Sequence, residues 1–239
     1  MQLGVVVLTG AGVSADSGLS TFRGPGGLWE GRRVEDVATP AAWAREPELV
    51  WRFYQMRRAA LSAVEPNPAH RALADLERRV TANGGSFTLV TQNVDDLHER
   101  AGSEALLHMH GELVRLLCES CGAGGPDMEH LDETSFVPCV ACGFPRLRPD
   151  IVWFGEVPYR LEEIEQALSA CTHFLAVGTS GVVYPAAGLL QAARSQGALT
   201  WVNSLEEPEN LHPDDTFLVG SAAEVVPRLV DELCAGWGC

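Results

Sequence analysis

Short apolar runs alternate with longer stretches of helical periodicity along most of the chain. The first run, Val5 to Leu8, is mostly β-branched, only a few residues long and ended by Thr9-Gly10, which favours a buried parallel strand. Similar runs follow at 87–90, 106–109, 151–154, 174–177, 199–202 and 217–219. Because helical patterns separate many of these runs, they predict a parallel sheet with helices on both faces.

The helical patterns place apolar residues three or four positions apart. Between Glu48 and Val64 such residues are Leu49, Val50, Phe53, Met56, Ala60 and Leu61. Pro66 and Pro68 then end the pattern, which predicts one long helix. Further helices are expected at 69–80, 161–170, 185–195 and 222–233. The segment 24–47 lacks clear periodicity and is expected to be an ordered loop that folds over a ligand, with glycines as hinges.

Composition is that of an ordinary globular domain. Hydrophobic residues make up 46% and charged residues 21% of the 239 residues, as in typical soluble proteins. No apolar run approaches the roughly 18 residues of a membrane span, and the first eight residues lack the basic region of a signal peptide. We therefore expect a cytoplasmic protein without a membrane partner.

The net charge of the chain indicates which classes of binding partner are favoured. The chain carries 32 acidic and 17 basic residues, a formal charge of −15. Such a balance disfavours direct nucleic-acid binding. It favours encounter with basic protein segments, although it serves equally well to keep a protein in solution. The sequence carries no signal for oligomeric state.

A glycine-rich loop follows the first predicted strand. Gly10, Gly12 and Ala15 have a G-x-G-x-x-A spacing, which suits a phosphate that approaches backbone N–H groups. A dinucleotide site for hydride transfer would also need an acidic residue at the end of a second strand about 20 positions on. Here Glu35 and Asp36 lie in a polar region without a strand. The spacing alone is equally compatible with a plain strand-turn-helix corner.

Four cysteines have the spacing of a metal site. Cys118 and Cys121 form one C-x-x-C pair, Cys139 and Cys142 form another, and 17 residues separate the pairs. This spacing is typical of a four-cysteine zinc ribbon, and four thiolates leave no position for water, so the zinc is expected to be structural. The remaining cysteines, Cys171, Cys234 and Cys239, are expected in the core or the tail.

One histidine stands at a favourable place for chemistry. His110 follows an apolar strand and precedes Gly111, which lets a ligand or the backbone come close. Histidine is the usual general base in enzymes but also a common packing residue. From the residues alone, both roles remain open for His110.

The longer string GAGVSADSGLSTFRG, residues 10–24, closely resembles the first loop of the sirtuins, which are NAD-dependent protein-lysine deacylases. Other segments resemble the same family in the same order over nearly the whole chain. In HMHGEL, residues 108–113, the matching position makes His110 the catalytic base. By the same resemblance, the residues expected to contact NAD are Gly10, Ala11, Gly12, Ala15, Phe22, Arg23, Trp29, Gln92, Asn93, Val94, Asp95, Gly178, Thr179, Ser180, Asn203, Ser204, Leu205 and Ala222.

The resemblance also implies where substrate binds. Val152, Phe154 and Gly155 match a strand that pairs with an extended substrate peptide. Thr21 replaces the acidic residue that many sirtuins carry before Phe-Arg, and Tyr54-x-x-Arg57 resembles the branch that removes succinyl and malonyl groups. A guanidinium can hold such a carboxylate in two parallel hydrogen bonds. From the sequence alone, Arg57 is as readily a solvated helix charge, with Arg52 and Arg58 as equal candidates for the role.

The implied reaction consumes NAD as a co-substrate of acyl-lysine proteins or peptides. The acyl oxygen attacks the ribose carbon as nicotinamide leaves, and His110 takes a ribose proton so that its hydroxyl attacks the acyl carbon. Free lysine and O-acyl-ADP-ribose are then released. The alternatives are mono-ADP-ribosyl transfer to a protein and a non-catalytic NAD-binding or zinc-ribbon module.

The expected fold class is therefore α/β, a Rossmann-like doubly wound parallel sheet into which a smaller zinc-ribbon and helical domain is inserted. We expect residues 1–25, 85–112 and 145–239 to form the Rossmann-like NAD-binding domain. Residues 26–84, a helical and cofactor-loop module, and 113–144, the zinc-ribbon module, are expected to form the small domain.

Overall fold

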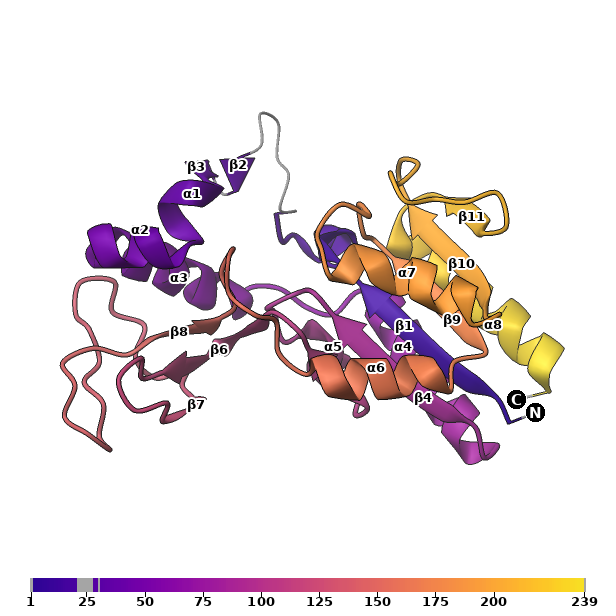
Figure 1. Cartoon of the computed structure of the whole chain (residues 1–239), viewed down its shortest axis with the longest axis horizontal. Coiled ribbons are helices and arrows are strands. Elements are labelled where there is room, and N and C mark those ends of the chain that lie inside the picture. The colour runs from indigo at the N-terminus through magenta and orange to yellow at the C-terminus, as the bar shows by residue number, and fades with distance from the viewer. Residues whose placement is uncertain (1, 21–27, 30, 239) are drawn as a thin grey trace.

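A computed structural model describes residues 2–20, 28–29 and 31–238 of the chain (Figure 1). Its main part is a six-stranded parallel sheet with the strand order β11-β10-β9-β1-β4-β5. The strands are β1 (Gly4–Thr9), β4 (Ser86–Thr91), β5 (Leu106–His108), β9 (His173–Val177), β10 (Leu199–Ser204) and β11 (Thr216–Val219). The doubly wound α/β prediction is confirmed.

Strand β1 is buried along its whole length and forms the centre of the sheet. Val5 and Val7 point into one core cluster, whereas Val6 and Leu8 point into another, as the alternation of side chains in a strand requires. Both faces of β1 are thus covered, which is why its sequence is a continuous apolar run.

Two layers of helices supply that cover. Helices α4 (Pro68–Ala82) and α8 (Ala222–Trp237) pack on one face, and α6 (Leu161–Ser169) and α7 (Ala186–Ser195) pack on the other. Figure 1 shows α6 and α7 in front of the sheet and α4 behind it. Helix α5 (Leu97–Ala101) lies between β4 and β5 in the chain.

A second, smaller body lies beside the carboxyl ends of the strands, at the left of Figure 1. It contains the antiparallel sheet β7-β6-β8 and three helices. Its elements are β2 (Leu28–Trp29), β3 (Arg32–Arg33), α1 (Val34–Val37), α2 (Pro40–Arg45), α3 (Pro47–Leu61), β6 (Gly111–Leu117), β7 (Gly124–Pro126) and β8 (Arg148–Ile151). Trp43, Trp51, Tyr54 and Trp153 dominate its core.

Three details differ from the sequence-based expectation. Helix α4 was expected within the small domain, but Leu73, Leu76 and Val80 belong to the core cluster of the large sheet. Part of the segment expected to be a loop forms α1 and α2, because Trp43 and its neighbours are buried in the small core. The strand expected at 151–154 is β8, which ends at Ile151.

Among the helices of the described residues, none has both the length and the apolar character that a bilayer span requires.

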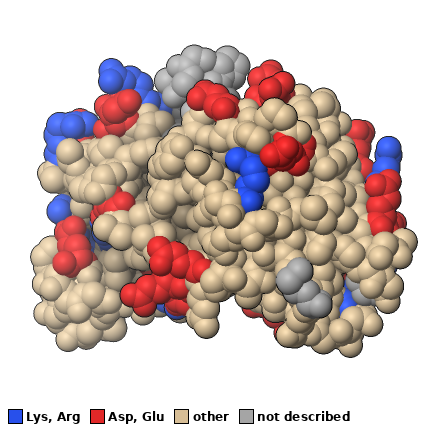
Figure 2. Space-filling view, turned by 45° about the vertical axis from the view of Figure 1, so that its right-hand side comes forward, with Lys and Arg blue, Asp and Glu red and all other residues tan. Residues whose placement is uncertain are grey.

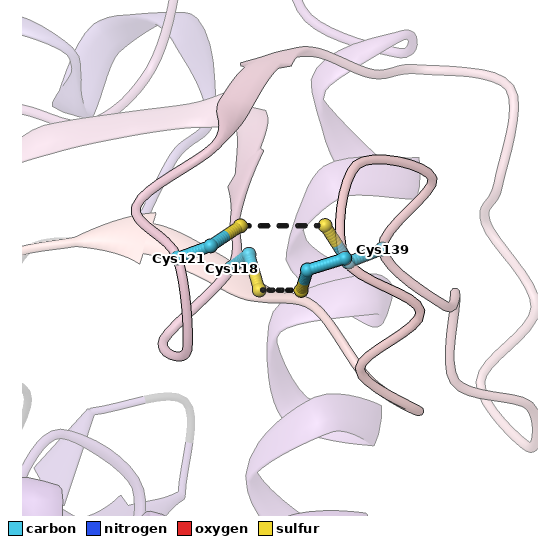
Figure 3. A group of neighbouring side chains, drawn as sticks. Cys118, Cys121 and Cys139 are labelled. Atoms are coloured by element: carbon cyan, nitrogen blue, oxygen red, sulfur yellow. Dashed lines mark hydrogen bonds between the residues drawn. The ribbon is translucent and has the colours of Figure 1, made fainter.

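The four predicted cysteine ligands meet at one point of the small body (Figure 3). The Sγ atoms of Cys118 and Cys142 are 3.7 Å apart, and those of Cys121 and Cys139 are 3.8 Å apart. Four sulfurs at about 2.3 Å from a tetrahedral zinc ion lie about 3.8 Å from one another. The arrangement therefore fits one four-cysteine zinc ion, which would be structural because its coordination is complete.

The two cysteine pairs sit on equivalent turns. Gly122 donates a backbone hydrogen bond to the carbonyl of Cys118, and Gly143 does so to Cys139. Both glycines have positive φ, 74° and 75°, which a residue with a side chain rarely adopts. The backbone of each turn thus directs its two thiols toward the same centre.

Removal of one ligand should release the zinc. We expect Cys121→Ser to contain little zinc and to melt at a lower temperature, because a structural zinc ion contributes folding free energy. Metal analysis and a thermal melt measure this. Cys171→Ala, which removes a buried thiol outside the cluster, should keep its zinc. A full zinc content in Cys121→Ser would contradict the assignment.

Candidate functional site

A cavity of about 620 Å³ lies between the two bodies, where the strands of the large sheet end. Its size is in the range of small-molecule sites. All the residues predicted to contact NAD or substrate line it, apart from three in the first loop region. Of those three, Phe22 and Arg23 lie outside the described residues, and only the backbone of Trp29, in β2, is described.

Backbone hydrogen bonds join the loops that form the cavity floor. Gln92 donates to the carbonyl of Thr9 at 2.9 Å, Gly12 donates to Gly178 at 2.9 Å, and Gly178 donates to Asn203 at 2.8 Å. A Cβ on Gly12 would lie 2.7 Å from the Cα of Gly178. The glycine spacing therefore serves a close approach of two loops as well as an approach by a ligand.

The first loop folds differently from a dinucleotide-binding corner of the usual kind. After β1 the chain makes two short 3₁₀ turns, Ala11–Val13 and Ala15–Ser17, and no α-helix starts within the described residues 10–20. The resemblance to the hydride-transfer pattern thus ends at the glycines, in agreement with the missing acidic residue of a second strand.

His110 lies between β5 and β6 and lines the cavity. Its Nδ1 atom is 3.1 Å from the carbonyl oxygen of Gln92, so Nδ1 carries the proton that it donates there. Burial lowers the pKa of His110, although the hydrogen bond to Gln92 opposes this. A neutral imidazole results, with its lone pair on Nε2. Such a group can accept a proton from a ligand in the cavity.

A buried polar network connects the first loop with the loop after β4. Ser14 Oγ donates to Asp95 Oδ2 at 3.0 Å and accepts from Asn93 Nδ2 at 3.1 Å. His70 Nδ1 faces the backbone N–H of Asn67, so its Nε2 donates to Ser14 Oγ at 3.3 Å. Sequence reasoning missed Ser14 and His70. Ser14 lies inside the recognised string, whereas the position of His70 follows only from the packing of α4.

The network holds Asp95 in place beside the cavity. Asp95 is only 7% exposed, and burial raises its pKa, opposed by hydrogen bonds from Leu97 and Ser14 and by the charge of Arg57. Its carboxyl group and the Asn93 amide can bind the two ends of another amide.

The three arginines of α3 have different surroundings. Arg57 lines the cavity, Arg52 is exposed, and Arg58 is buried in hydrogen bonds to Gln55 and Asp127. Tyr54 also lines the cavity, and its hydroxyl accepts a hydrogen bond from Trp153 Nε1 at 3.0 Å. Burial raises the pKa of Tyr54 further above neutrality, so the phenol keeps its proton.

The segment after β8 crosses from one body to the other. Val152 donates to the carbonyl of His110 at 2.9 Å, and Phe154 donates to that of Ala38 at 3.0 Å. Val152, Phe154 and Gly155 line the cavity, although they lie outside any strand.

The buried histidines should make stability depend on pH. Burial lowers the pKa of His70 to about 4 and that of His98 well below its usual value. Both groups regain a pKa of about 6.5 on unfolding. Above pH 6.5 they stay neutral in both states, and between pH 6.5 and about 4 the unfolded chain takes up protons that the folded chain does not. Stability should therefore fall as pH falls through this window.

His70→Gln tests this effect. The contribution of one histidine is at most about 1.4 kcal/mol per pH unit. We expect the free energy of unfolding, measured in urea from pH 7.5 to 4.5, to decrease less steeply in His70→Gln than in the unmodified protein. Equal slopes would show that His70 binds its proton alike in both states.

The sequence and the fold of this chain are both similar to those of known proteins. A model described as the Sir2 family matches residues 10–185. The chain is 49% identical to a protein of Caulobacter vibrioides named NAD-dependent protein deacylase, over 97% of both chains. It also superposes on the crystal structure of a Sir2 homolog–NAD complex, with a TM-score of 0.87 and 38% identity over 97% of this chain and 90% of the other.

A third relative was solved with a peptide. The structure of Sir2Af2 bound to a myristoylated histone peptide matches with a TM-score of 0.75 and 31% identity, over 98% of this chain and 92% of the other. Together with the cavity, its histidine and the four-cysteine cluster, these matches show that the chain belongs to the Sir2 family, the sirtuins.

Proposed function

We propose that this protein is an NAD-dependent protein-lysine deacylase. The observation that carries the proposal is a neutral His110, with its lone pair on Nε2, in a cavity that the glycine loop and Asp95 also line. The deacylase name of the Caulobacter vibrioides relative and the NAD complex of a Sir2 homolog support it.

The lining residues fit NAD in two parts. The adenosine half would lie over the loops after β9 and β10, against residues 178–180, 203–205 and Ala222. The nicotinamide half would lie near Asn93 and Asp95, whose amide and carboxyl groups can pair with a carboxamide. When bound, NAD supplies an electrophilic ribose carbon with nicotinamide as its leaving group.

The residues of the chain then bind, orient and move a proton. His110 Nε2 accepts a proton from a ribose hydroxyl, and the carbonyl of Gln92 stabilises the charge that forms by holding Nδ1–H. The hydrogen bonds among Ser14, Asn93 and Asp95 keep the amide-binding groups in one orientation.

Acyl-lysine is the expected substrate class. The segment 152–155 and Phe154 in particular, which is 45% exposed, offer a surface beside the cavity for an extended peptide. Acidic side chains occur in several groups over the face drawn in Figure 2. With a net charge of −15, this surface favours lysine-rich protein segments.

The preferred acyl groups are succinyl and malonyl, with acetyl as a further substrate. Tyr54 and Arg57 lie one helical turn apart on α3 and both line the cavity, while Arg52 and Arg58 do not share that position. A guanidinium beside a neutral phenol suits a carboxylate at the end of an acyl chain.

One assay tests the reaction. Peptides of one sequence that carry acetyl-, succinyl- or malonyl-lysine are incubated with NAD, and nicotinamide and deacylated peptide are measured. We expect equal amounts of both products, with label from the adenine of NAD on O-acyl-ADP-ribose. Label that stays on protein would indicate ADP-ribosyl transfer, and no nicotinamide release would indicate a binding module.

Removal of the His110 imidazole should strongly lower the deacylation rate but leave NAD binding intact. We expect His110→Ala and His110→Tyr to lower the deacylation rate by about 10² to 10⁴-fold, the usual contribution of a general base, while NAD binding persists in a titration. His212→Ala, at an exposed histidine paired with Asp214, is the control. Near-normal turnover in the His110 variants would refute the assignment.

Removal of the Arg57 charge should change acyl preference. Arg57→Met keeps an apolar stem, and a hydrogen bond to a charged group contributes about 1.5 to 3 kcal/mol. We expect kcat/KM for succinyl-lysine peptide to fall about ten- to a hundredfold relative to acetyl-lysine peptide. Arg52→Met removes an exposed charge from the same helix and should leave the ratio unchanged. A parallel loss of both activities would contradict a role in acyl recognition.

A further inference from the structure

The hydroxyl of Tyr54 is held by Trp153, which is not among the site residues predicted from the sequence. Trp153 Nε1 lies 3.0 Å from Tyr54 Oη, and the two side chains are 2% and 0% exposed. An indole nitrogen only donates, so Tyr54 Oη is the acceptor in this bond. The bond fixes the position of the phenol oxygen. Because Trp153 occupies one of its acceptor sites, the phenol O–H points away from the indole N–H.

Arg148 and Glu156 hold the indole ring. The guanidinium carbon of Arg148 is 3.7 Å from the centroid of the Trp153 ring, which is a close cation–π contact. Arg148 donates to both oxygens of Glu156, at 2.7 and 2.9 Å, and Glu156 Oε2 accepts the backbone N–H of Trp153 at 2.8 Å. Thus one ion pair fixes the backbone of Trp153 through Glu156 and its ring through Arg148.

The packing on either side limits other positions of the ring. Arg148 is 8% exposed and also donates to the carbonyl of Ile151 at 2.6 Å, so its guanidinium cannot turn away without the loss of several bonds. The ring of Trp43 lies 5.8 Å from that of Trp153, and Tyr54 lies 6.3 Å away. Trp153 is therefore confined between a cation and the aromatic core of the small body.

The charges around Trp153 are consistent with this position of its ring. The charges of Arg148 and Glu156 compensate each other, as the bidentate contact shows. Arg57, in contrast, lines the cavity. A substrate carboxylate near Tyr54 would lie beside Arg57, whereas the Arg148 guanidinium is already bound to Glu156.

We propose that Arg148, Glu156 and Trp153 form a tryptophan clamp that sets acyl selectivity by fixing the Tyr54 hydroxyl as a hydrogen-bond donor to the carboxylate of an acidic acyl group. Trp153 and Glu156 also line the cavity, but the role proposed for the three is a positioning one, exerted through Tyr54. Trp153 lies between Val152 and Phe154 in sequence, so the clamp also joins the acyl site to the segment expected to bind peptide. The inference rests on the proposed role of Tyr54 and Arg57 in acidic-acyl recognition.

Trp153→Phe is the direct test, because it keeps an aromatic ring and removes the N–H. One neutral hydrogen bond accounts for roughly a three- to tenfold change. We expect the ratio of kcat/KM for succinyl-lysine over acetyl-lysine peptide to fall by that factor, mainly through a higher KM for the succinyl peptide. Fluorescent peptides without NAD should show the same loss in binding of the succinyl form.

Three further variants separate the clamp from general damage. Trp43→Phe makes the same change in the same aromatic cluster, where Nε1 donates to Glu119 and not to Tyr54, and should leave the ratio unchanged. Arg148→Lys keeps the charge but loses the bidentate and stacked contacts, and should lower the ratio. In a Tyr54→Phe background, Trp153→Phe should have no further effect on the ratio.

The two proposals fail in different ways. If the unmodified protein does not remove succinyl groups, the acidic-acyl assignment falls, and the clamp falls with it. If the unmodified protein does so and Trp153→Phe keeps its ratio, or if the effects of Trp153→Phe and Tyr54→Phe simply add, the clamp alone is overturned. A thermal melt of each variant confirms that the comparison is made on folded protein.

Discussion

The backbone contact between the loops after β1 and β9 is the constraint on which the rest of the site depends. Gly12 and Gly178 approach so closely that a side chain on either would collide with the other loop. The same loops bond to those after β4 and β10, through Gln92 and Asn203. Four strand ends thus form one continuous floor, and the polar residues that follow each strand are placed along it. In open parallel sheets this edge is where ligands bind.

Different hydrogen-bond partners give two neighbouring buried histidines opposite pKa shifts. Burial lowers the pKa of His110, and its Nδ1–H is committed to a backbone carbonyl, so it is a neutral base. Burial also lowers the pKa of His108, but the hydrogen bond and charge of Glu99 outweigh it and raise the pKa overall. His110, and not His108, therefore lines the cavity with a nitrogen that can accept a proton.

The small body forms the side of the cavity that faces the carboxyl ends of the sheet strands. Its helix α3 presents Tyr54 and Arg57 to the cavity and commits Arg58 to Asp127, near the cysteine module. This ion pair thus joins α3 to the segment that follows the first cysteine pair. The segment 152–155 closes the wall through bonds to His110 and Ala38.

Features that depend on local pattern could be predicted from the amino-acid sequence alone. Continuous apolar runs predicted β1, β4 and β9, helical periodicity predicted α3 and α8, and the C-x-x-C spacing predicted the metal module, since each signal arises from residues close together in the chain. The resemblance to sirtuins made His110 the candidate base, although the tautomer of its ring follows only from the position of Gln92.

Features that depend on contacts between distant segments became visible only in the folded chain. Ser14 and His70 meet across 56 residues, and Trp153 and Tyr54 meet across 99. No periodicity shows that α4 packs on the large sheet, or that Arg57 and not Arg58 faces the cavity. Periodicity indicates which residues share a helix face, but not which neighbouring element that face meets. Those outcomes follow from which side chains the neighbouring elements can bury and pair.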